Sequence, residues 1–222
     1  MVTPVKGSDI QKKVFVWRKE MKKRILIYGD SNTWGYRGKS LGRYDTERQW
    51  TNIFQQMLGE EYEVIQQGLR GRTAGNCHKQ HNLYKDGKTG YEISLQSNSP
   101  VNYVIIALGT NDANPKYERI ISEVAQDLNW YETYTKEYAQ RDAAMKNFKK
   151  VLFLGVSNFQ DNDYFKPAVN YSTKLNKALQ KSCENVIIPP DLTYAEDKLH
   201  FNEADHKKVA EKVYEEFKER EA

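Results

Sequence analysis

A short apolar run that ends at a glycine strongly limits what this chain can fold into. Ile25-Leu26-Ile27-Tyr28 has the length and branching of a strand buried on both faces, as in parallel sheets. Gly29 allows a sharp turn, and Asp30-Ser31-Asn32 follow where that strand should end. Ligands of open parallel sheets bind at the carboxyl ends of the strands, so Ser31 stands where chemistry is expected. Because Gly, Asp, Ser and Asn also form ordinary turns, this stretch alone leaves a structural turn open as the alternative.

Four further runs are predicted to be strands, at residues 62–66, 101–108, 151–154 and 185–188, and the run at 101–108 is the strongest of them. Between the runs, apolar residues return at helical spacing, as Trp50, Phe54 and Leu58 do. Alternation of strands and helices predicts right-handed crossovers in one sheet. We therefore expect an α/β protein, a three-layer α/β/α sandwich around a mostly parallel five-stranded sheet of the flavodoxin-like type.

The helices can be placed from the same pattern. Asp45-Thr46 should open the first long helix, and Gly59 should close it. We expect a helix near residues 91–96, two helices between 117 and 149 and another around 171–179. The last helix should begin near Asn202, whose side chain can cap it. Tyr131, Tyr134 and Tyr138 lie on one helical stripe and are expected to cover the sheet.

Length and composition agree with one folded domain. A chain of 222 residues can bury a substantial core, and 29% charged residues argue against a membrane protein. No apolar run approaches the roughly 18 residues of a membrane span, and the start lacks a signal peptide's apolar stretch. We therefore expect a cytoplasmic protein. Cys77 and Cys183 offer no disulfide framework and are expected to be reduced thiols.

The net charge of +4 is concentrated at the start of the chain. Residues 1–24 hold eight basic and two acidic side chains, which leaves 26 basic and 28 acidic ones for the rest. We interpret residues 1–20 as a basic extension and residues 21–222 as the functional domain. A basic tail that binds RNA or a membrane surface is the alternative, but the segment lacks interleaved aromatics and a helical apolar face. We predict no nucleic-acid or membrane partner.

Four motifs in order identify a family resemblance. They are Gly29-Asp30-Ser31-Asn32-Thr33-Trp34-Gly35, Gly68-Leu69-Arg70-Gly71-Arg72-Thr73, Gly109-Thr110-Asn111-Asp112 and Asp197-Lys198-Leu199-His200. This set resembles the SGNH, or GDSL-type, hydrolases, and most closely their small arylesterase and acyltransferase-like members. The continuation His200-Phe201-Asn202-Glu203-Ala204 strengthens that likeness. The resemblance covers residues 24 to 215.

The resemblance implies a catalytic triad of Ser31, His200 and Asp197. It also implies an oxyanion hole formed by Ser31, Gly71 and Asn111. A serine hydroxyl needs an adjacent base to attack an ester, and an aspartate that orients the histidine completes this machinery. Asp30 and Asp112 are expected to brace their loops by accepting backbone hydrogen bonds, also by resemblance.

We predict a serine esterase that cleaves short, acetyl-like esters through an acyl-enzyme. Trp34 and Phe201 are candidate contacts for the substrate, a small-molecule ester, because they flank the nucleophile and the base. A carbohydrate O-deacetylase with the same triad, or a weakly catalytic binding protein on this fold, remains an alternative. No cofactor is needed. His78 and His81 lack nearby ligand partners, so no metal site is predicted. The sequence leaves a homo-oligomer open.

Overall fold

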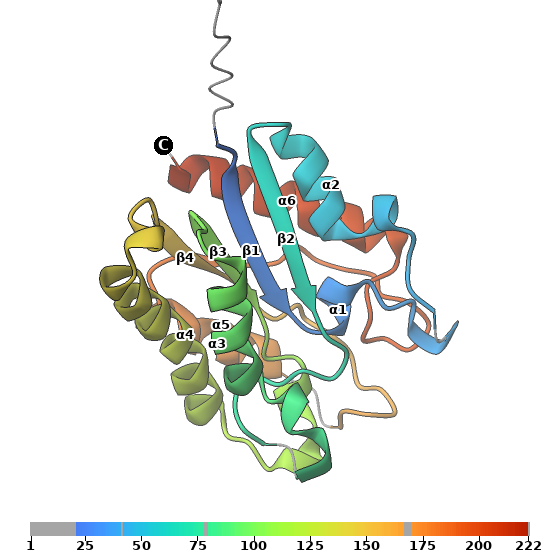
Figure 1. The fold of residues 1–222 in the computed structure, drawn as a ribbon. Coiled ribbons are helices and arrows are strands. Elements are labelled where there is room, and N and C mark those ends of the chain that lie inside the picture. The colour runs from blue at the N-terminus through green and yellow to red at the C-terminus, as the bar shows by residue number, and fades with distance from the viewer. Residues whose placement is uncertain (1–20, 41, 78–79, 167–169, 222) are drawn as a thin grey trace, which may run out of the picture.

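The computed structural model describes residues 21–40, 42–77, 80–166 and 170–221, so the extension predicted for residues 1–20 lies outside it. Five strands form one sheet in the order β2-β1-β3-β4-β5. All neighbouring strands run parallel, which confirms the predicted fold class (Figure 1). The strands are β1 (Lys23–Gly29), β2 (Tyr62–Gly68), β3 (Tyr103–Ala107), β4 (Lys150–Leu154) and β5 (Val186–Ile187).

Helices cover both faces of this sheet, as a parallel sheet requires. The helices α2 (Trp50–Leu58) and α6 (Glu203–Glu221) pack together on one face (Figure 1). The other face is covered by α3 (Gly87–Asn98), α4 (Ile121–Arg141) and α5 (Tyr171–Ser182). The single turn α1 (Ser31–Trp34) lies just beyond the end of β1.

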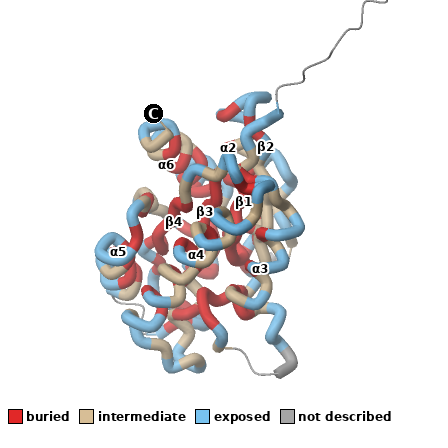
Figure 2. Tube along the Cα trace, turned by 60° about the vertical axis from the view of Figure 1, so that its left-hand side comes forward, coloured by how far each residue is buried: buried red, intermediate tan, exposed pale blue. Residues whose placement is uncertain are grey.

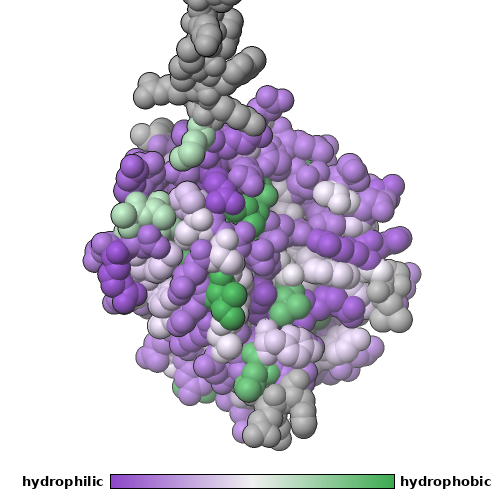
Figure 3. Space-filling view, in the orientation of Figure 1, coloured by the Kyte–Doolittle hydropathy of each residue, from purple (hydrophilic) through white to green (hydrophobic). Residues whose placement is uncertain are grey.

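The core lies along the central strands. All four residues of Ile25–Tyr28 have no exposed surface, as predicted for a strand covered on both faces. Figure 2 shows the same arrangement, with buried segments in the middle of the molecule and exposed segments on the outer helices. The face drawn in Figure 3 is mainly hydrophilic, with separate apolar spots rather than one continuous patch.

The region between residues 117 and 149 differs from the two helices predicted. One helix, α4, runs from Ile121 to Arg141, and a 3₁₀ turn, Ala143–Met145, follows it. No Gly or Pro interrupts residues 121–141, so nothing breaks the helix. The tyrosine stripe does cover the sheet, because the Tyr131 ring is fully buried and lies 6.1 Å from that of Tyr28.

The start of α2 also differs from the prediction. The Asp45 side chain makes no capping hydrogen bond, and a 3₁₀ turn, Thr46–Arg48, precedes the helix. The backbone N–H of Trp50 instead donates to Nδ1 of His206 at 3.2 Å. An imidazole from α6 therefore satisfies one of the free N–H groups at the start of α2. The predicted cap of α6 is confirmed, since Asn202 Oδ1 accepts from the Asp205 N–H at 2.9 Å.

Two further features bear on the sequence predictions. Both cysteines are free thiols, as expected. Among the residues that the structure describes, no helix combines the length and the apolar character needed to cross a bilayer.

Candidate active site

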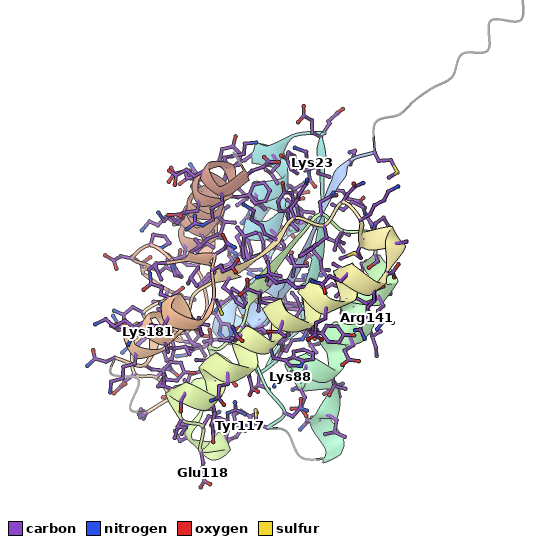
Figure 4. The ribbon with its side chains drawn as sticks, turned by 90° about the vertical axis from the view of Figure 1, so that its left-hand side faces the viewer. Lys23, Lys88, Tyr117, Glu118, Arg141 and Lys181 are labelled. Atoms are coloured by element: carbon purple, nitrogen blue, oxygen red, sulfur yellow. The ribbon has the colours of Figure 1, made fainter. Side chains whose placement is uncertain are left out.

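Residues from six separate segments of the described chain line one cleft of about 570 Å³. Ser31, Gly71, Asn111 and His200 all contribute to its wall. The cleft lies at the carboxyl edge of the sheet, where β1, β2 and β3 end. Figure 4 shows its lining residue Tyr117 at the opposite end of the molecule from Lys23, the first residue of β1. The structure thus brings residues of all four sequence motifs together at one edge of the sheet.

Ser31 is the first residue of α1, so it begins a helical turn rather than lying in an open loop. Asp30 is the N-cap of this turn and accepts from the Asn32 N–H at 2.9 Å. Its brace role is therefore as expected from the sequence. Burial raises the pKa of Asp30 to about 6, although the hydrogen bond from Asn32 opposes this shift.

The Ser31 hydroxyl lies 2.9 Å from Nε2 of His200. On the far side of the ring, Nδ1 lies 2.7 Å from Oδ2 of Asp197. An ionised carboxylate can only accept, so Nδ1 carries the proton and donates to Asp197. Nε2 is then free to accept the hydrogen bond of the serine hydroxyl. This is the arrangement that a serine nucleophile and its base require.

Asp197 is held in an oriented, ionised state. Its Oδ1 accepts from the backbone N–H groups of Leu199 and His200 at 3.2 and 3.0 Å. Burial tends to raise the pKa of Asp197, but the hydrogen bonds from the side chain and backbone of His200 outweigh it and lower the pKa to about 2. Lys198, with a φ of 56°, allows the tight turn that brings the two side chains together.

A second buried carboxylate, Asp205, lies close to His200 in sequence but hydrogen-bonds to a different part of the chain. It accepts from the backbone N–H groups of Thr193 and Tyr194 at 3.0 and 2.7 Å. These bonds tie the loop that follows β5 to the start of α6. Asp205 is therefore a brace for the loop, and Asp197 is the partner of the imidazole.

Gly71 and Asn111 lie side by side in the cleft. The Asn111 amide donates to the carbonyl of Arg72 at 3.0 Å, which ties it to the Gly71 loop and leaves its second N–H for another acceptor. Gly71 has a φ of 75°, a conformation that other residues rarely adopt. A Cβ at Gly71 would be 3.5 Å from the nearest atoms, those of Lys85. The glycine is thus required by its backbone conformation, while a Cβ there would make only ordinary contact with the side chain of Lys85.

Two buried side chains fix the loops behind these donors. Asp112 accepts from the Ala74 N–H at 2.8 Å, as expected, and burial raises its pKa to about 6. The Arg72 guanidinium donates to the carbonyl of Gly29 at 2.8 Å and lies 3.8 Å over the ring of Tyr28. Arg72 therefore joins the second motif to the strand that carries the serine.

The two aromatic residues proposed for substrate contact do not line the cleft. Phe201 is 5% exposed, and its ring packs 5.6 Å from that of His206 in the core. The predicted contact between Phe201 and substrate is therefore not supported, because its buried side chain is absent from the lining of the cleft. Trp34 is half-buried beneath the guanidinium of Arg43, at 5.0 Å.

Sequence reasoning missed two residues that contact the triad or its neighbours. The Tyr36 ring packs edge-on against His200 at 4.6 Å and lines the cleft. Asn32 accepts from the Phe201 N–H at 3.0 Å. Asn32 lies next to Ser31 within the first motif, and this position was the only sequence feature that pointed to a role in the site. Nothing in the sequence indicates that Tyr36 contacts His200.

The metal alternative drawn from His78 cannot be followed, because His78 lies outside the described residues. Within the described ranges, no group of three or more His, Cys, Asp or Glu side chains could hold a metal ion.

Comparison with known proteins places this geometry in a family. Residues 27–208 match the model of the GDSL-like lipase/acylhydrolase family. The fold is similar to an aryl esterase of M. smegmatis, with a TM-score of 0.80 at 24% identity over 89% of this chain and 99% of that one. It is equally similar to Est24, a carbohydrate acetylesterase from Sinorhizobium meliloti, with a TM-score of 0.80 at 22% identity over 90% of this chain and 100% of that one.

A more distant structure is the psychrotrophic esterase EstA from Pseudoalteromonas sp., with a TM-score of 0.61 at 16% identity over 90% of this chain and 98% of that one. No curated protein matches the sequence. The family match spans most of the chain and agrees with the parallel sheet found here. The chain is therefore an SGNH-type serine hydrolase and belongs to the GDSL-like lipase/acylhydrolase family.

Proposed function

We propose that this protein is a serine esterase that hydrolyses short, acetyl-like esters, with Ser31 as nucleophile, His200 as base and Asp197 as the residue that orients it. The single observation that carries the proposal is the continuous line of contacts from Ser31 through His200 to Asp197, at 2.9 and 2.7 Å.

The reaction follows from this geometry. Ser31 Oγ attacks the ester carbonyl while its proton moves to Nε2 of His200, and Asp197 stabilises the imidazolium that forms. Negative charge develops on the carbonyl oxygen, where the N–H groups of Ser31 and Gly71 and the amide of Asn111 donate. One such donor is worth roughly 10²–10³ in rate.

The tetrahedral intermediate then collapses. The bond to the alcohol oxygen breaks, and Nε2 of His200 returns its proton to the departing alcohol. A water molecule attacks the acyl-enzyme with the same imidazole as base, which releases the acid and restores Ser31. All of these steps use groups of this chain.

The lining of the cleft favours a short acyl group. Its only side chains without a polar group are Leu69, Phe165 and Leu199 among the described residues, and Phe165 and Leu199 are only 3% and 5% exposed, so they offer little surface to an alkyl chain. Each acyl CH₂ gains about 0.8 kcal/mol only where an apolar wall buries it. Chain extension should therefore bring no gain in kcat/KM.

A carbohydrate O-deacetylase is a second candidate, favoured by the polar cleft. Asn82 and Asn114 can hydrogen-bond to hydroxyl groups, and the ring of Tyr84, 58% exposed, offers a flat surface to a sugar. Its similarity in fold to a carbohydrate acetylesterase points in the same direction.

The test is kcat/KM for acetyl, butyryl, octanoyl and palmitoyl esters of one alcohol, together with acetylated sugars. We expect acetyl to be the best substrate and Ser31→Ala to abolish turnover. A steady rise towards octanoyl would contradict the proposal and reveal an apolar channel. Absence of turnover on every ester would favour a binding protein on this fold.

A further inference from the structure

The walls of the cleft carry an unbalanced positive charge. Three cationic side chains line it, Arg70, Lys85 and Lys116, and no Asp or Glu is among the described residues that do so. They come from three separate segments: the loop after β2, the 3₁₀ segment Gln80–Lys85 and the 3₁₀ turn Pro115–Tyr117. Their convergence on one cleft is therefore a property of the fold.

Each of these cations packs on a tyrosine instead of an acid. Arg70 lies 4.2 Å over the ring of Tyr36, Lys116 4.7 Å over Tyr117 and Lys85 5.8 Å over Tyr84. No ion pair within the described part of the chain includes any of the three. A cation–π contact positions a cation but does not cancel its charge.

The acids nearest the triad lie behind the wall of the cleft and do not line it. Asp30 and Asp197 are 3% and 8% exposed and lie behind Ser31 and His200, where each holds its own hydrogen bonds. The domain as a whole is not basic either, since residues 25–222 hold 26 basic and 28 acidic side chains. The positive charge is thus a local feature of the cleft.

Two of the three cations lie close to the reacting groups. Arg70 packs on Tyr36, whose ring lies 4.6 Å from that of His200. The ammonium of Lys85 lies 3.5 Å from the position that a Cβ on Gly71 would occupy. A substrate whose carbonyl lies between Ser31 and Gly71 therefore extends past these cations.

We propose that the alcohol part of the substrate carries a negatively charged group, a carboxylate, sulfate or phosphate, which Arg70, Lys85 and Lys116 bind. The inference rests on the proposed esterase function. The cleft of about 570 Å³ is far larger than an acetyl group, so the alcohol part occupies most of it and meets the cations. Clefts lined by one sign of charge also attract oppositely charged substrates.

A matched pair of esters tests the proposal. The carboxylate of 4-acetoxybenzoate and the amide of 4-acetoxybenzamide have nearly the same shape, and only the first is charged. We expect kcat/KM, corrected for the hydroxide-catalysed rate of each ester, to favour the carboxylate by about tenfold, mainly through KM. The preference should shrink when salt is raised to about 0.5 M, because salt screens these charges. The analogues 4-acetoxyphenyl sulfate and 4-acetoxyphenyl phosphate show which anion is preferred.

Substitutions of single cations show which side chains cause the preference for the anionic ester. Arg70→Gln and Lys116→Gln should each lower the ratio of anionic to neutral kcat/KM several-fold, and the double variant should bring it close to one. Lys181→Gln removes an exposed cation from the last turn of α5 and should leave the ratio unchanged. Lys85 is left unchanged, because its side chain adjoins Gly71 and its replacement would also alter the oxyanion hole.

Two kinetic results would overturn the inference. One is equal kcat/KM for the two esters while Ser31 is still required, which leaves the esterase function intact. The other is a preference that survives in the Arg70→Gln, Lys116→Gln double variant. If no ester is turned over, calorimetric binding to Ser31→Ala protein decides instead. Tighter binding of 4-acetoxybenzoate than of the amide supports the cation site, and equal binding contradicts it.

Discussion

The backbone N–H of Phe201 donates to Oδ1 of Asn32 at 3.0 Å, across 169 residues of sequence. This bond joins the residue after Ser31 to the residue after His200. Both residues are buried, so water does not compete for the bond. The distance between nucleophile and base is therefore held by their neighbours as well as by their own contact.

Asn32→Ala should lower kcat while leaving KM nearly unchanged. Without the bond the two loops are free to separate slightly, and a misplacement of about 1 Å can cost roughly 10²-fold in rate. Asn98→Ala, at the distant end of α3, is the control and should retain activity. Full kcat in Asn32→Ala protein of unchanged thermal stability would show that this bond does not position the triad.

Gly38→Ala should impair catalysis through Asp197. Gly38 has a φ of 66°, and a Cβ there would lie 2.8 Å from Oδ2 of Asp197, the atom that holds His200. Gly59, with a φ of 74°, has nothing within 4 Å of such a Cβ and provides the matched control. Both alanine variants should lose roughly 1 kcal/mol or more of stability from backbone strain, and only Gly38→Ala should lose kcat. Equal kcat in the two variants would contradict this role of the loop.

Asp197→Asn and Asp205→Asn should have different effects, the first on catalysis and the second on stability. The asparagine amide can donate where the carboxylate only accepts, which favours the wrong tautomer of His200, so kcat should fall by about 10³–10⁴ with the fold intact. Asp205→Asn should instead lower the thermal stability, because Asp205 accepts from the backbone of Thr193 and Tyr194. A larger loss of kcat in folded Asp205→Asn than in Asp197→Asn would reverse these assignments.

The His206 imidazole should make stability fall in acid. Burial lowers its pKa from 6.5 to about 4, so the unfolded chain binds its proton more readily. Its contribution is complete above pH 6.5 and is lost as the pH falls towards 4. The loss amounts to about 3 kcal/mol at most. Asp30 and Asp112 have the opposite slope, since burial raises their pKa values to about 6 and the folded state holds their protons.

His206→Asn isolates this contribution, because asparagine does not titrate and its Oδ1 can accept the Trp50 N–H in place of Nδ1. Urea unfolding of both proteins across this pH range should show a smaller loss of stability on acidification in the variant. Identical pH dependence in the two proteins would contradict the assignment.

Much of the architecture could be predicted because strands and motifs are local in sequence. The runs at Ile25–Tyr28 and 101–108 are apolar enough to require cover on both faces, and the first and third motifs directly follow them. The roles of Asp30 and Asp112 as loop braces came from the resemblance and agree with their observed hydrogen bonds.

The features that could not be predicted depend on contacts between segments far apart in the sequence. The N–H of Trp50 at the start of α2 is capped by His206, 156 residues away in the sequence. The residues around Asp45 therefore hold no signal for the actual cap. Phe201 was assigned to the substrate because it follows His200, but adjacent side chains can point in opposite directions, and its ring packs beside His206 in the core. The positive cleft was equally hidden, because Arg70, Lys85 and Lys116 belong to segments that meet only in the folded chain.

The central claim is that Ser31 is activated by His200, and covalent labelling tests it most directly. The protein is treated with a fluorophosphonate, its intact mass is measured, and the labelled peptide is sequenced. The account predicts one label, on Ser31, that disappears in Ser31→Ala and persists in Ser157→Ala, a control that removes another buried serine at a strand end. A label that survives in Ser31→Ala and maps to Ser157 or Cys77 would contradict it.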